Sequence, residues 1–521
     1  MGAGFRASMN WLHTWAGVVV GAVLFAIFWM GTLSVFDREI DRWMMPETRL
    51  APVAEPASLD RIREVAQALA GDAPSLFISL PTERQPVLGI GFRKDGEFVS
   101  RNVDPATATL LPERGTLGGT GFIFPFHFSL NIKLWSIGYW LVGLAAMAML
   151  ALLVSGVIVH VKIFADFFTL RTDKKAPRVA LDLHNVTGVL GLPFHFMITL
   201  SGLIIFVLVY FPNAWQGTFP DRAGYFKEAF GSYSRPKANQ PGDPMSLDAL
   251  SAEAVRLWGG GTPLYLRLWH TGDANAVVEF RRSYEDRVTM NTDTLYLDAA
   301  TGAVLSRQTQ QPIMTAQRFL SGLHFIQFRH WTLRWIYFAL GLSGCVLIAT
   351  GFLFWLESRR KRHEKQGLKG LGVVEGLTIG ATTGIILATL SFFIANKLLP
   401  PGMAERQSYE AWAFYLLWAA GFAHGWIRRG QAWAEQSWAI AAAALCAPVL
   451  NALITGDHLA RSLSKGQWAV AGMDLALLAL AAIAALTARK LQRRPATTSR
   501  AMPGRAQGST RGSTREGRQH A

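Results

Sequence analysis

Six histidines lie in or beside long apolar segments of the 521-residue chain, where their side chains could bind a metal. They are His13, His127, His160, His184, His195 and His324. A neutral imidazole is a good ligand for haem iron, and electron-transfer haems commonly take one imidazole on each face of the ring. Ionisable side chains inside a membrane are rare and usually functional, so six together favour haem ligation over simple packing.

The chain has two cysteines, Cys345 and Cys446, and both fall in apolar segments. This excludes a disulfide framework and a cysteine-rich metal site. The sequence also lacks the Cys-x-x-Cys-His motif that attaches haem covalently. Any haem must therefore be held non-covalently, as haem b.

The elements that must position the histidines are long apolar runs. Hydrophobic residues make up 50% of the chain, and they gather in runs of about 20 residues, enough to cross a hydrocarbon core about 30 Å thick. The sequence predicts a mainly α-helical polytopic membrane protein with about eight transmembrane helices. The expected spans are 11–36, 135–160, 185–211, 331–356, 371–396, 410–428, 435–455 and 467–488.

The formal net charge of +15 does not indicate a nucleic-acid-binding protein. Many of the basic residues gather in the short loops 161–180 and 357–370, and such a bias orients membrane proteins with those loops in the cytoplasm. Both termini are then expected in the cytoplasm. The first apolar run has no small-residue cleavage site after it, so we expect it to remain as an anchor.

The first and third spans carry the same pattern around their histidines. Residues 12–17, Leu-His-Thr-Trp-Ala-Gly, resemble residues 183–188, Leu-His-Asn-Val-Thr-Gly. A further glycine follows each histidine at the same interval, Gly31 in one copy and Gly202 in the other. Such self-similarity indicates an internal duplication.

The segments outside the membrane repeat as well. Residues 58–60 and 246–248 both read Ser-Leu-Asp at the start of a predicted helix. Residues 103–108 and 297–302 both suit tight turns between strands. We therefore expect two periplasmic α+β domains, each followed by a His-Phe pair at the return to the membrane.

Both copies begin on the same side of the membrane, which makes them parallel repeats about an axis along the membrane normal. Equivalent residues of parallel repeats face one another. We expect His13 to meet His184 at the cytoplasmic end, and His127 to meet His324 at the periplasmic end.

Glycines near the histidines could leave room for a flat macrocycle. Gly17 and Gly188 lie one helical turn after His13 and His184, and Gly156 lies one turn before His160. The alternative is that these glycines only let helices pack closely, as small residues in membranes usually do.

His160 and His195 have no counterpart in the other copy, where Trp355 and Leu24 align with them. His195 would lie on nearly the same helix face as His184, about 16 Å deeper. Three roles are open to this pair of residues: ligating a further haem, pairing with each other, or carrying protons.

Taken together, these residues resemble the PepSY-associated transmembrane proteins, and within them the FoxB-like ferric-siderophore reductases. The resemblance covers roughly residues 8–360. It rests on residues 12–17, 127–130, 156–160, 164–171, 182–195 and 323–325.

The resemblance implies periplasmic PepSY modules and membrane haems that pass electrons outward to Fe(III) in a siderophore, at the bacterial inner membrane. Reduction to Fe(II) weakens binding by hard oxygen chelators, so the iron is released. The protein would be an oxidoreductase of iron uptake with two haems b, and with a third if His160 and His195 form another site.

The resemblance and the spans together give the expected domain boundaries. These are spans at 8–36, 121–160, 183–211 and 316–356, PepSY-like domains at 47–120 and 212–315, cytoplasmic loops at 161–182 and 357–370, a C-terminal four-helix membrane module at 371–490, and a disordered basic tail at 491–521. The C-terminal module departs from the four-helix pattern of the group. It could dock an electron donor, form a separate module or act as a packing scaffold.

The source of electrons is expected outside the chain. The glycine-rich stretch 115–121 lacks the strand-turn-helix setting of a dinucleotide site, so an external flavin or a quinol is favoured over bound NAD(P)H. Lys133, Arg329 and Arg334 flank the outer histidine pair and are candidates for haem propionates, although snorkelling is the commoner explanation. The remaining histidines considered, His270, His363, His424, His458 and His520, are assigned structural or solvated positions.

Two other functions fit parts of the pattern. PepSY domains could sense a ligand or restrain a periplasmic protease, with the histidines serving structure alone. A proton-coupled transporter could instead use His160, His195 and the extra helices as a proton path.

Overall fold

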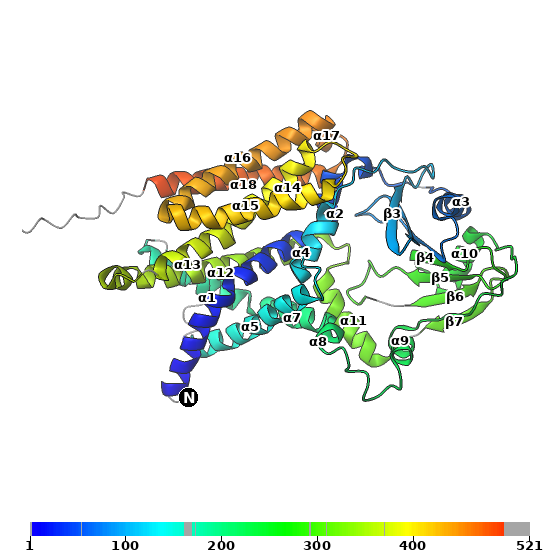
Figure 1. The fold of residues 1–521 in the computed structure, drawn as a ribbon, viewed down its shortest axis with the longest axis horizontal. Coiled ribbons are helices and arrows are strands. Elements are labelled where there is room, and N and C mark those ends of the chain that lie inside the picture. The colour runs from blue at the N-terminus through cyan, green and yellow to red at the C-terminus, as the bar shows by residue number, and fades with distance from the viewer. Residues whose placement is uncertain are drawn as a thin grey trace, which may run out of the picture.

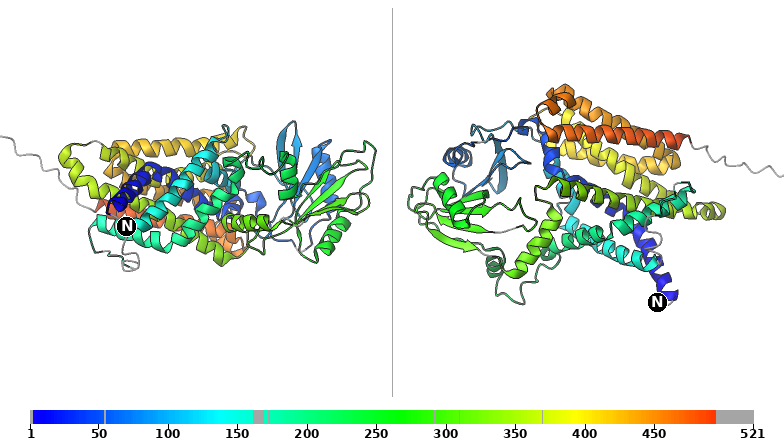
Figure 2. Two further views of the ribbon diagram at one scale, coloured as in Figure 1. Left: turned by 90° about the horizontal axis from the view of Figure 1, so that it is seen from below. Right: turned by 180° about the vertical axis from the view of Figure 1, so that it is seen from behind.

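A computed structural model of the protein describes residues 3–53, 55–160, 169–171, 173–290, 293–308, 310–368 and 370–493. Within these ranges the protein is mainly helical, with one antiparallel sheet beyond one end of the helices (Figures 1 and 2). We call the end of the helices next to the sheet the sheet end, and the opposite end the far end. Residues 161–168 of the expected loop, with Lys162 and Phe164, and the basic tail from residue 494, with His520, lie outside the described residues.

Six helices of the described part are long and apolar enough to cross a membrane, so this is a membrane protein. They are α1 (Ala3–Ser34), α5 (Ile137–Val159), α12 (Trp331–Gln366), α16 (Gly430–Thr455), α18 (Trp468–Gln492) and the continuous helix of α13 (Gly370–Ile379), η3 (Gly380–Gly384) and α14 (Ile385–Leu398). A seventh span results if α6 (Ala176–Leu190) and α7 (Leu192–Ile205) count as one. The span expected at 410–428 falls in α15 (Arg406–Arg428), which is not among these helices, so the number eight stays a prediction.

The third expected span is a broken helix. α6 and α7 meet at an angle of 64°, with Gly191 between them and Pro193 in the first turn of α7. Proline has no N–H to donate to the carbonyl four residues earlier, and its ring crowds that turn, so a helix bends there. His184 and His195 lie on opposite sides of the bend. The expectation that they share one face of a straight helix is therefore wrong.

The fourth expected span is longer than predicted. α12 continues to Gln366, through most of the segment 357–370 that was expected to form a loop. Arg360 pairs with Glu357 one turn earlier, at 2.9 Å. Such pairs, together with good helix-forming residues, extend a helix beyond its apolar part.

One seven-stranded sheet joins the two segments that lie outside the helices. Its strands are β1 (Ser75–Ser79), β2 (Leu88–Lys94), β3 (Glu97–Val103), β4 (Pro263–Trp269), β5 (Val277–Arg282), β6 (Thr294–Asp298) and β7 (Val304–Gln308), in the order β3-β2-β1-β4-β5-β6-β7. β1 pairs with β4, with Ile78 opposite Leu266. The two outer domains expected from the sequence thus share a sheet, and each covers an edge strand that the other would leave unpaired.

The helices α3 (Leu59–Ala70) and α10 (Leu247–Trp258) pack on one face of this sheet and cap each other. Asp248 accepts hydrogen bonds from the backbone N–H of Leu59, at 2.9 Å, and from the Ser58 hydroxyl. Asp60 accepts the equivalent bonds from Leu247, at 2.8 Å, and from Ser246. The two Ser-Leu-Asp segments therefore satisfy each other's first-turn donors. The exchange is what two copies of one unit would produce, while their identity as duplicated PepSY domains stays a prediction.

An arginine–glutamate–arginine latch joins the sheet domain to the membrane helices. Glu39, in α2 (Asp37–Met44), binds Arg84 at 2.8 Å and Arg334 at 3.1 Å. Arg84 belongs to the loop between β1 and β2, whereas Arg334 belongs to α12 and is fully buried. Arg334 also stacks on the Phe36 and Trp331 rings. It is therefore bound inside the protein and is not free for a haem propionate, in contrast to the expectation from the sequence.

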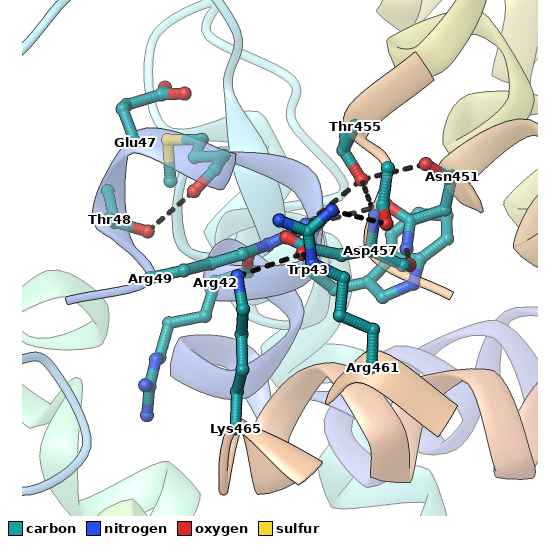
Figure 3. Close-up of polar contacts among 12 residues, drawn as sticks. Arg42, Trp43, Glu47, Thr48, Arg49, Asn451, Thr455, Asp457, Arg461 and Lys465 are labelled. Carbon is teal, nitrogen blue, oxygen red and sulfur yellow. Dashed lines mark hydrogen bonds and ion pairs between the residues drawn. The ribbon is translucent and has the colours of Figure 1, made fainter. Parts of the chain in front are cut away.

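The C-terminal module is fastened to the rest of the protein by buried polar contacts at the sheet end. Arg49 donates to Asp457 at 2.8 Å and to Asn451 at 3.0 Å, as Figure 3 shows. Close by, Lys397 donates to the Trp43 carbonyl at 2.7 Å, and the Trp43 indole donates to Asp474 at 2.8 Å. Two basic residues that lie outside the expected spans therefore hold the module in place.

We expect the latch to contribute stability that is independent of pH in the physiological range. Burial alone would raise the pKa of Glu39, but the hydrogen bonds and charges of Arg84 and Arg334 outweigh it and lower this pKa to about 2. A carboxyl with a depressed folded pKa stabilises the fold above its unfolded pKa, about 4.3, and this stability is lost as the pH falls through the folded pKa. Arg84 also pairs with Asp37, at 3.1 Å, and keeps that partner when Glu39 is replaced. Glu39→Gln should therefore cost about 3 kcal/mol at neutral pH, because it removes the carboxylate that pairs with the buried Arg334 guanidinium.

Thermal melting of the purified protein in detergent tests this, with Glu64→Gln, an exposed carboxyl of α3, as the matched control. The wild-type melting temperature should exceed that of Glu39→Gln by a similar margin at pH values of about 5 to 8. Equal melting temperatures for wild type and Glu39→Gln at pH 7 would contradict the latch.

Candidate functional site

The structure brings both predicted histidine pairs together. His13 of α1 and His184 of α6 meet at the far end, with ring centroids 6.2 Å apart and ring planes at 81°. His127 of α4 (Phe124–Ser129) and His324 of α11 (Pro312–Phe325) meet at the sheet end, with centroids 5.9 Å apart and planes at 28°. A metal bound about 2 Å from one nitrogen of each ring would separate the centroids by roughly 6 Å. Both pairs thus have the spacing of two axial ligands to one metal.

Each of these four imidazoles is oriented by a hydrogen bond to the backbone of a neighbouring helix. The acceptor carbonyls are those of Leu152 for His13 at 3.0 Å, Leu347 for His184 at 2.8 Å, Ile27 for His127 at 2.9 Å and Ile198 for His324 at 2.8 Å. The nitrogen involved is Nδ1 in every case. Because a carbonyl only accepts, Nδ1 carries the proton, and a neutral ring then keeps the Nε2 lone pair free. This is the tautomer of a metal-binding histidine whose second nitrogen is fixed by an outer hydrogen bond.

A glycine lies one helical turn after each acceptor carbonyl and gives the ring room. A Cβ added there would approach the Cε1 atom of the ring, at 2.6 Å for Gly31 and His127, 2.9 Å for Gly202 and His324, 3.1 Å for Gly351 and His184, and 3.2 Å for Gly156 and His13. Gly17, which the sequence linked to His13, does not touch that ring, since a Cβ on it would first meet Leu152 at 3.9 Å. Gly351 was not identified from the sequence.

A cavity of about 560 Å³ surrounds the far-end pair. Cofactor and small-molecule sites usually have volumes of about 300–1,000 Å³. The lining includes His13, His184, His160, Gly17, Gly188 and Trp355. The far-end cavity therefore has the size and the ligands that a haem needs.

Two arginines at this cavity were missed by the sequence analysis. Arg6 and Arg359 line it, and Arg6 donates to the Val159 carbonyl at 3.2 Å while Arg359 lies over the Trp355 ring at 4.7 Å. Arg6 lies two helical turns before His13 and so on the same face of α1. That spacing was a usable signal. Arg359 was counted only as part of a charged loop, and its position became visible once α12 proved longer.

The cavity at the sheet-end pair is smaller, about 120 Å³. His127 and His324 line it together with Phe128, Phe206 and Tyr210. This volume is below the range of about 300–1,000 Å³ that is usual for cofactor sites, so a macrocycle between these two histidines would require lining side chains to move. The two sites thus share ligand geometry but differ in the space around it.

His160 and His195 lie in different surroundings. His160 follows α5 and lines the far-end cavity together with His13 and His184. His195 is fully buried and packs against the Phe28 ring at 5.8 Å, with Nε2 at 3.3 Å from the Leu340 carbonyl. His195 lines neither cavity. The contacts place His160, but not His195, beside a histidine pair.

Four of the other histidines in the described part make local structural contacts. His424 lies 2.9 Å from Glu435, His270 lies 2.9 Å from the Arg235 carbonyl, and His458 caps α17 (Leu459–Ser464). His363 packs against Trp355. Within the described ranges, no group of three or more His, Cys, Asp or Glu side chains could hold a metal ion.

The fold and the paired histidines define a polytopic membrane protein with an outer sheet domain inserted between its spans. Residues 10–358, which include both histidine pairs and the whole sheet, match the family described as the PepSY-associated TM region, and the chain belongs to this family. A protein of Pseudomonas aeruginosa, described as uncharacterized, is 28% identical over 366 residues, which cover 66% of this chain and 88% of the relative. The family match ends before α13, so α13–α18 lie beyond it.

We expect a glycine to tolerate alanine better when an added Cβ would lie farther from its nearest neighbouring atom. Gly31→Ala should be destabilising, because overpacking costs about 1–3 kcal/mol and outweighs a gain in helix propensity of about 1 kcal/mol. Gly17→Ala should be neutral or stabilising, because the added Cβ would lie 3.9 Å from its nearest neighbour, the Leu152 side chain. Melting temperatures in detergent measure both. A Gly31→Ala protein as stable as Gly17→Ala would show that the His127 ring does not depend on that glycine.

Proposed function

We propose that this protein carries electrons across the bacterial inner membrane through two haems b, and reduces a ferric siderophore on the periplasmic side. The observation that carries the proposal is the pair of imidazoles at each end of the helices, with Nδ1 of every ring bound to a carbonyl and the centroids about 6 Å apart. Two-imidazole ligation is the usual arrangement of low-spin electron-transfer haems.

The separation of the two pairs supports a path across the membrane. α1 carries His13 near the far end and supplies both Ile27 and Gly31, against which His127 is held. Gly31 is eighteen residues after His13, a rise of about 27 Å along a helix. That rise approaches the thickness of the hydrocarbon core, about 30 Å. Two sites so placed could pass an electron from one face to the other.

The chain's own residues have distinct parts in this function. Bound haem would supply one-electron redox chemistry at each histidine pair. His13 with His184, and His127 with His324, would hold the haems, while the carbonyls of Leu152, Leu347, Ile27 and Ile198 fix the rings. Arg6 and Arg359 would neutralise propionates at the far end. One electron reaching the siderophore converts Fe(III) to Fe(II), which hard oxygen ligands hold less tightly.

The remaining parts of the protein fit supporting roles. The basic segment at the end of α12 lies at the far end, which supports a cytoplasmic location for that end and a periplasmic one for the sheet. An external flavin or a membrane quinol would then deliver electrons near His13 and His184. The buried contacts of Arg49 and Lys397 favour a packing scaffold among the roles open to the C-terminal module.

We expect each histidine pair to hold one haem. Purified wild-type protein should show Soret and α/β bands, and His184→Ala and His324→Ala should each lose about half of the Soret absorbance, because each removes one axial ligand of one pair. The double variant should lose nearly all of it. His424→Ala, in a local contact with Glu435, is the control and should keep the full spectrum.

Absorption spectra of the five proteins, normalised to protein concentration, decide the question. Protein without a Soret band, or a double variant with an unchanged spectrum, would rule out the proposed ligands. A spectrum without haem bands would favour the alternative function, in which the PepSY domains sense a ligand or restrain a protease and the histidines serve structure alone.

We expect the reduced protein to give its electrons to ferric iron. Under anaerobic conditions, a ferric siderophore should restore the oxidised haem spectrum, whereas the same siderophore loaded with gallium should not, because Ga(III) is not reduced under these conditions. Stopped-flow absorbance at the α band measures both rates. Equal rates with iron and gallium would show that the siderophore is not the electron acceptor.

A further inference from the structure

The sheet face opposite α3 and α10 carries arginines and aromatic rings. Successive residues of a strand point to opposite faces, so Leu266 and Leu268 of β4 enter the core under the two helices while Tyr265, Arg267 and Trp269 point the other way. Residues opposite one another on paired strands share a face, which adds Phe77 of β1 and Glu279 and Arg281 of β5. We call Arg267, Arg281, Tyr265, Trp269 and Phe77, with Arg318 of α11, the arginine platform.

Positive charge on the platform exceeds its negative charge. The buried carboxylate of Glu279 is 3.9 Å from Arg267 and 4.0 Å from Arg281, at the limit of an ion pair. Arg318 of α11 adds a third guanidinium group, which lies over the Phe230 ring at 5.2 Å. The Nε atoms of Arg281 and Arg318 are buried and have no hydrogen-bond partner among the residues that the structure describes. A buried donor without an acceptor is costly, so an anionic ligand there would be stabilised.

The aromatic rings alternate with these guanidinium groups. Arg267 lies over the Trp269 ring at 5.2 Å and over the Phe77 ring at 5.7 Å, and Arg281 lies over the Tyr265 ring at 5.4 Å. The side chains remain accessible, with 35% of Arg267 and 22% of Arg281 exposed. Rings and planar guanidinium groups together bind flat aromatic anions by stacking and by charge.

The platform also lies close to the sheet-end histidine pair. Arg318 and His324 are both on α11, six residues apart, which is a rise of about 9 Å. α11 itself runs between the sheet and the membrane helices (Figure 1). A ligand held by Arg318 and Arg281 would therefore lie near the site from which electrons would leave.

We propose that the arginine platform binds the ferric chelate, and that it selects a trianionic tris-catecholate over a trihydroxamate. Three catecholates around Fe(III) present aromatic rings and a negative charge, which match the rings and the surplus arginines. A ferric trihydroxamate is neutral or cationic and lacks those rings. This inference rests on the proposed function, since it names the substrate class of the same electron path. In a purely structural role, the same arginines would only stack on the sheet's own aromatic side chains.

Binding of a gallium chelate tests the platform without any electron transfer. Full-length protein in detergent is titrated by calorimetry with gallium(III) tris-catecholate of a tris(2,3-dihydroxybenzoyl) ligand, and separately with a gallium(III) trihydroxamate. Wild type should bind the catecholate and should bind the hydroxamate at least tenfold more weakly. Arg281→Gln and Arg318→Gln should each weaken catecholate binding about tenfold or more, because each removes charge-assisted hydrogen bonds.

Arg282→Gln is the matched control, because Arg282 follows Arg281 in β5 and so points to the opposite face, 3.7 Å from Asp293. It should bind the catecholate as wild type does. Unchanged melting temperatures show that each variant is folded. Catecholate affinities equal among wild type, Arg281→Gln and Arg318→Gln, or equal affinities for the two chelates, overturn the inference. Because the titration needs no haem, its outcome is separate from that of the spectra that test the proposed function.

Discussion

The hydrogen bond from an imidazole Nδ1 to a backbone carbonyl of a neighbouring helix is the contact on which the rest of this structure depends. It occurs four times and links α1 to α5, α6 to α12, α4 to α1 and α11 to α7. Each bond fixes the protonated nitrogen, Nδ1, and so leaves the Nε2 lone pair of a neutral ring free to bind a metal. The same four contacts that tie the helices together therefore decide what the histidines can bind.

The carbonyls can serve in this way because of the glycine one turn further along each helix. A helical carbonyl already accepts the amide of the residue four positions later, and a side chain on that residue would keep the ring away. Gly31, Gly156, Gly202 and Gly351 remove the obstruction. α1 has a special position among the helices, since it carries His13 and also holds His127. A displacement of α1 would disturb both histidine pairs at once.

Ion pairs hold the sheet domain to the membrane helices. Glu39 binds Arg84 from the sheet domain and Arg334 from α12, with little access for water. The union of β1 with β4 makes one rigid sheet from two segments that are separated by two membrane helices in the sequence. That union creates the arginine platform, because Phe77 comes from the first segment and Arg267 and Arg281 from the second. α11 connects the platform to His324.

The sequence by itself determined the membrane class, the six candidate histidines and the two pairs that meet, His13 with His184 and His127 with His324. It could do so because apolar runs are local patterns, and because parallel copies of an internal repeat bring equivalent residues together. Only the tertiary structure decided which glycines contact the rings, that Arg334 binds Glu39, that α6 and α7 bend at Pro193, and that the two outer units share a sheet. These features depend on three-dimensional packing that neither an apolar run nor a repeat specifies.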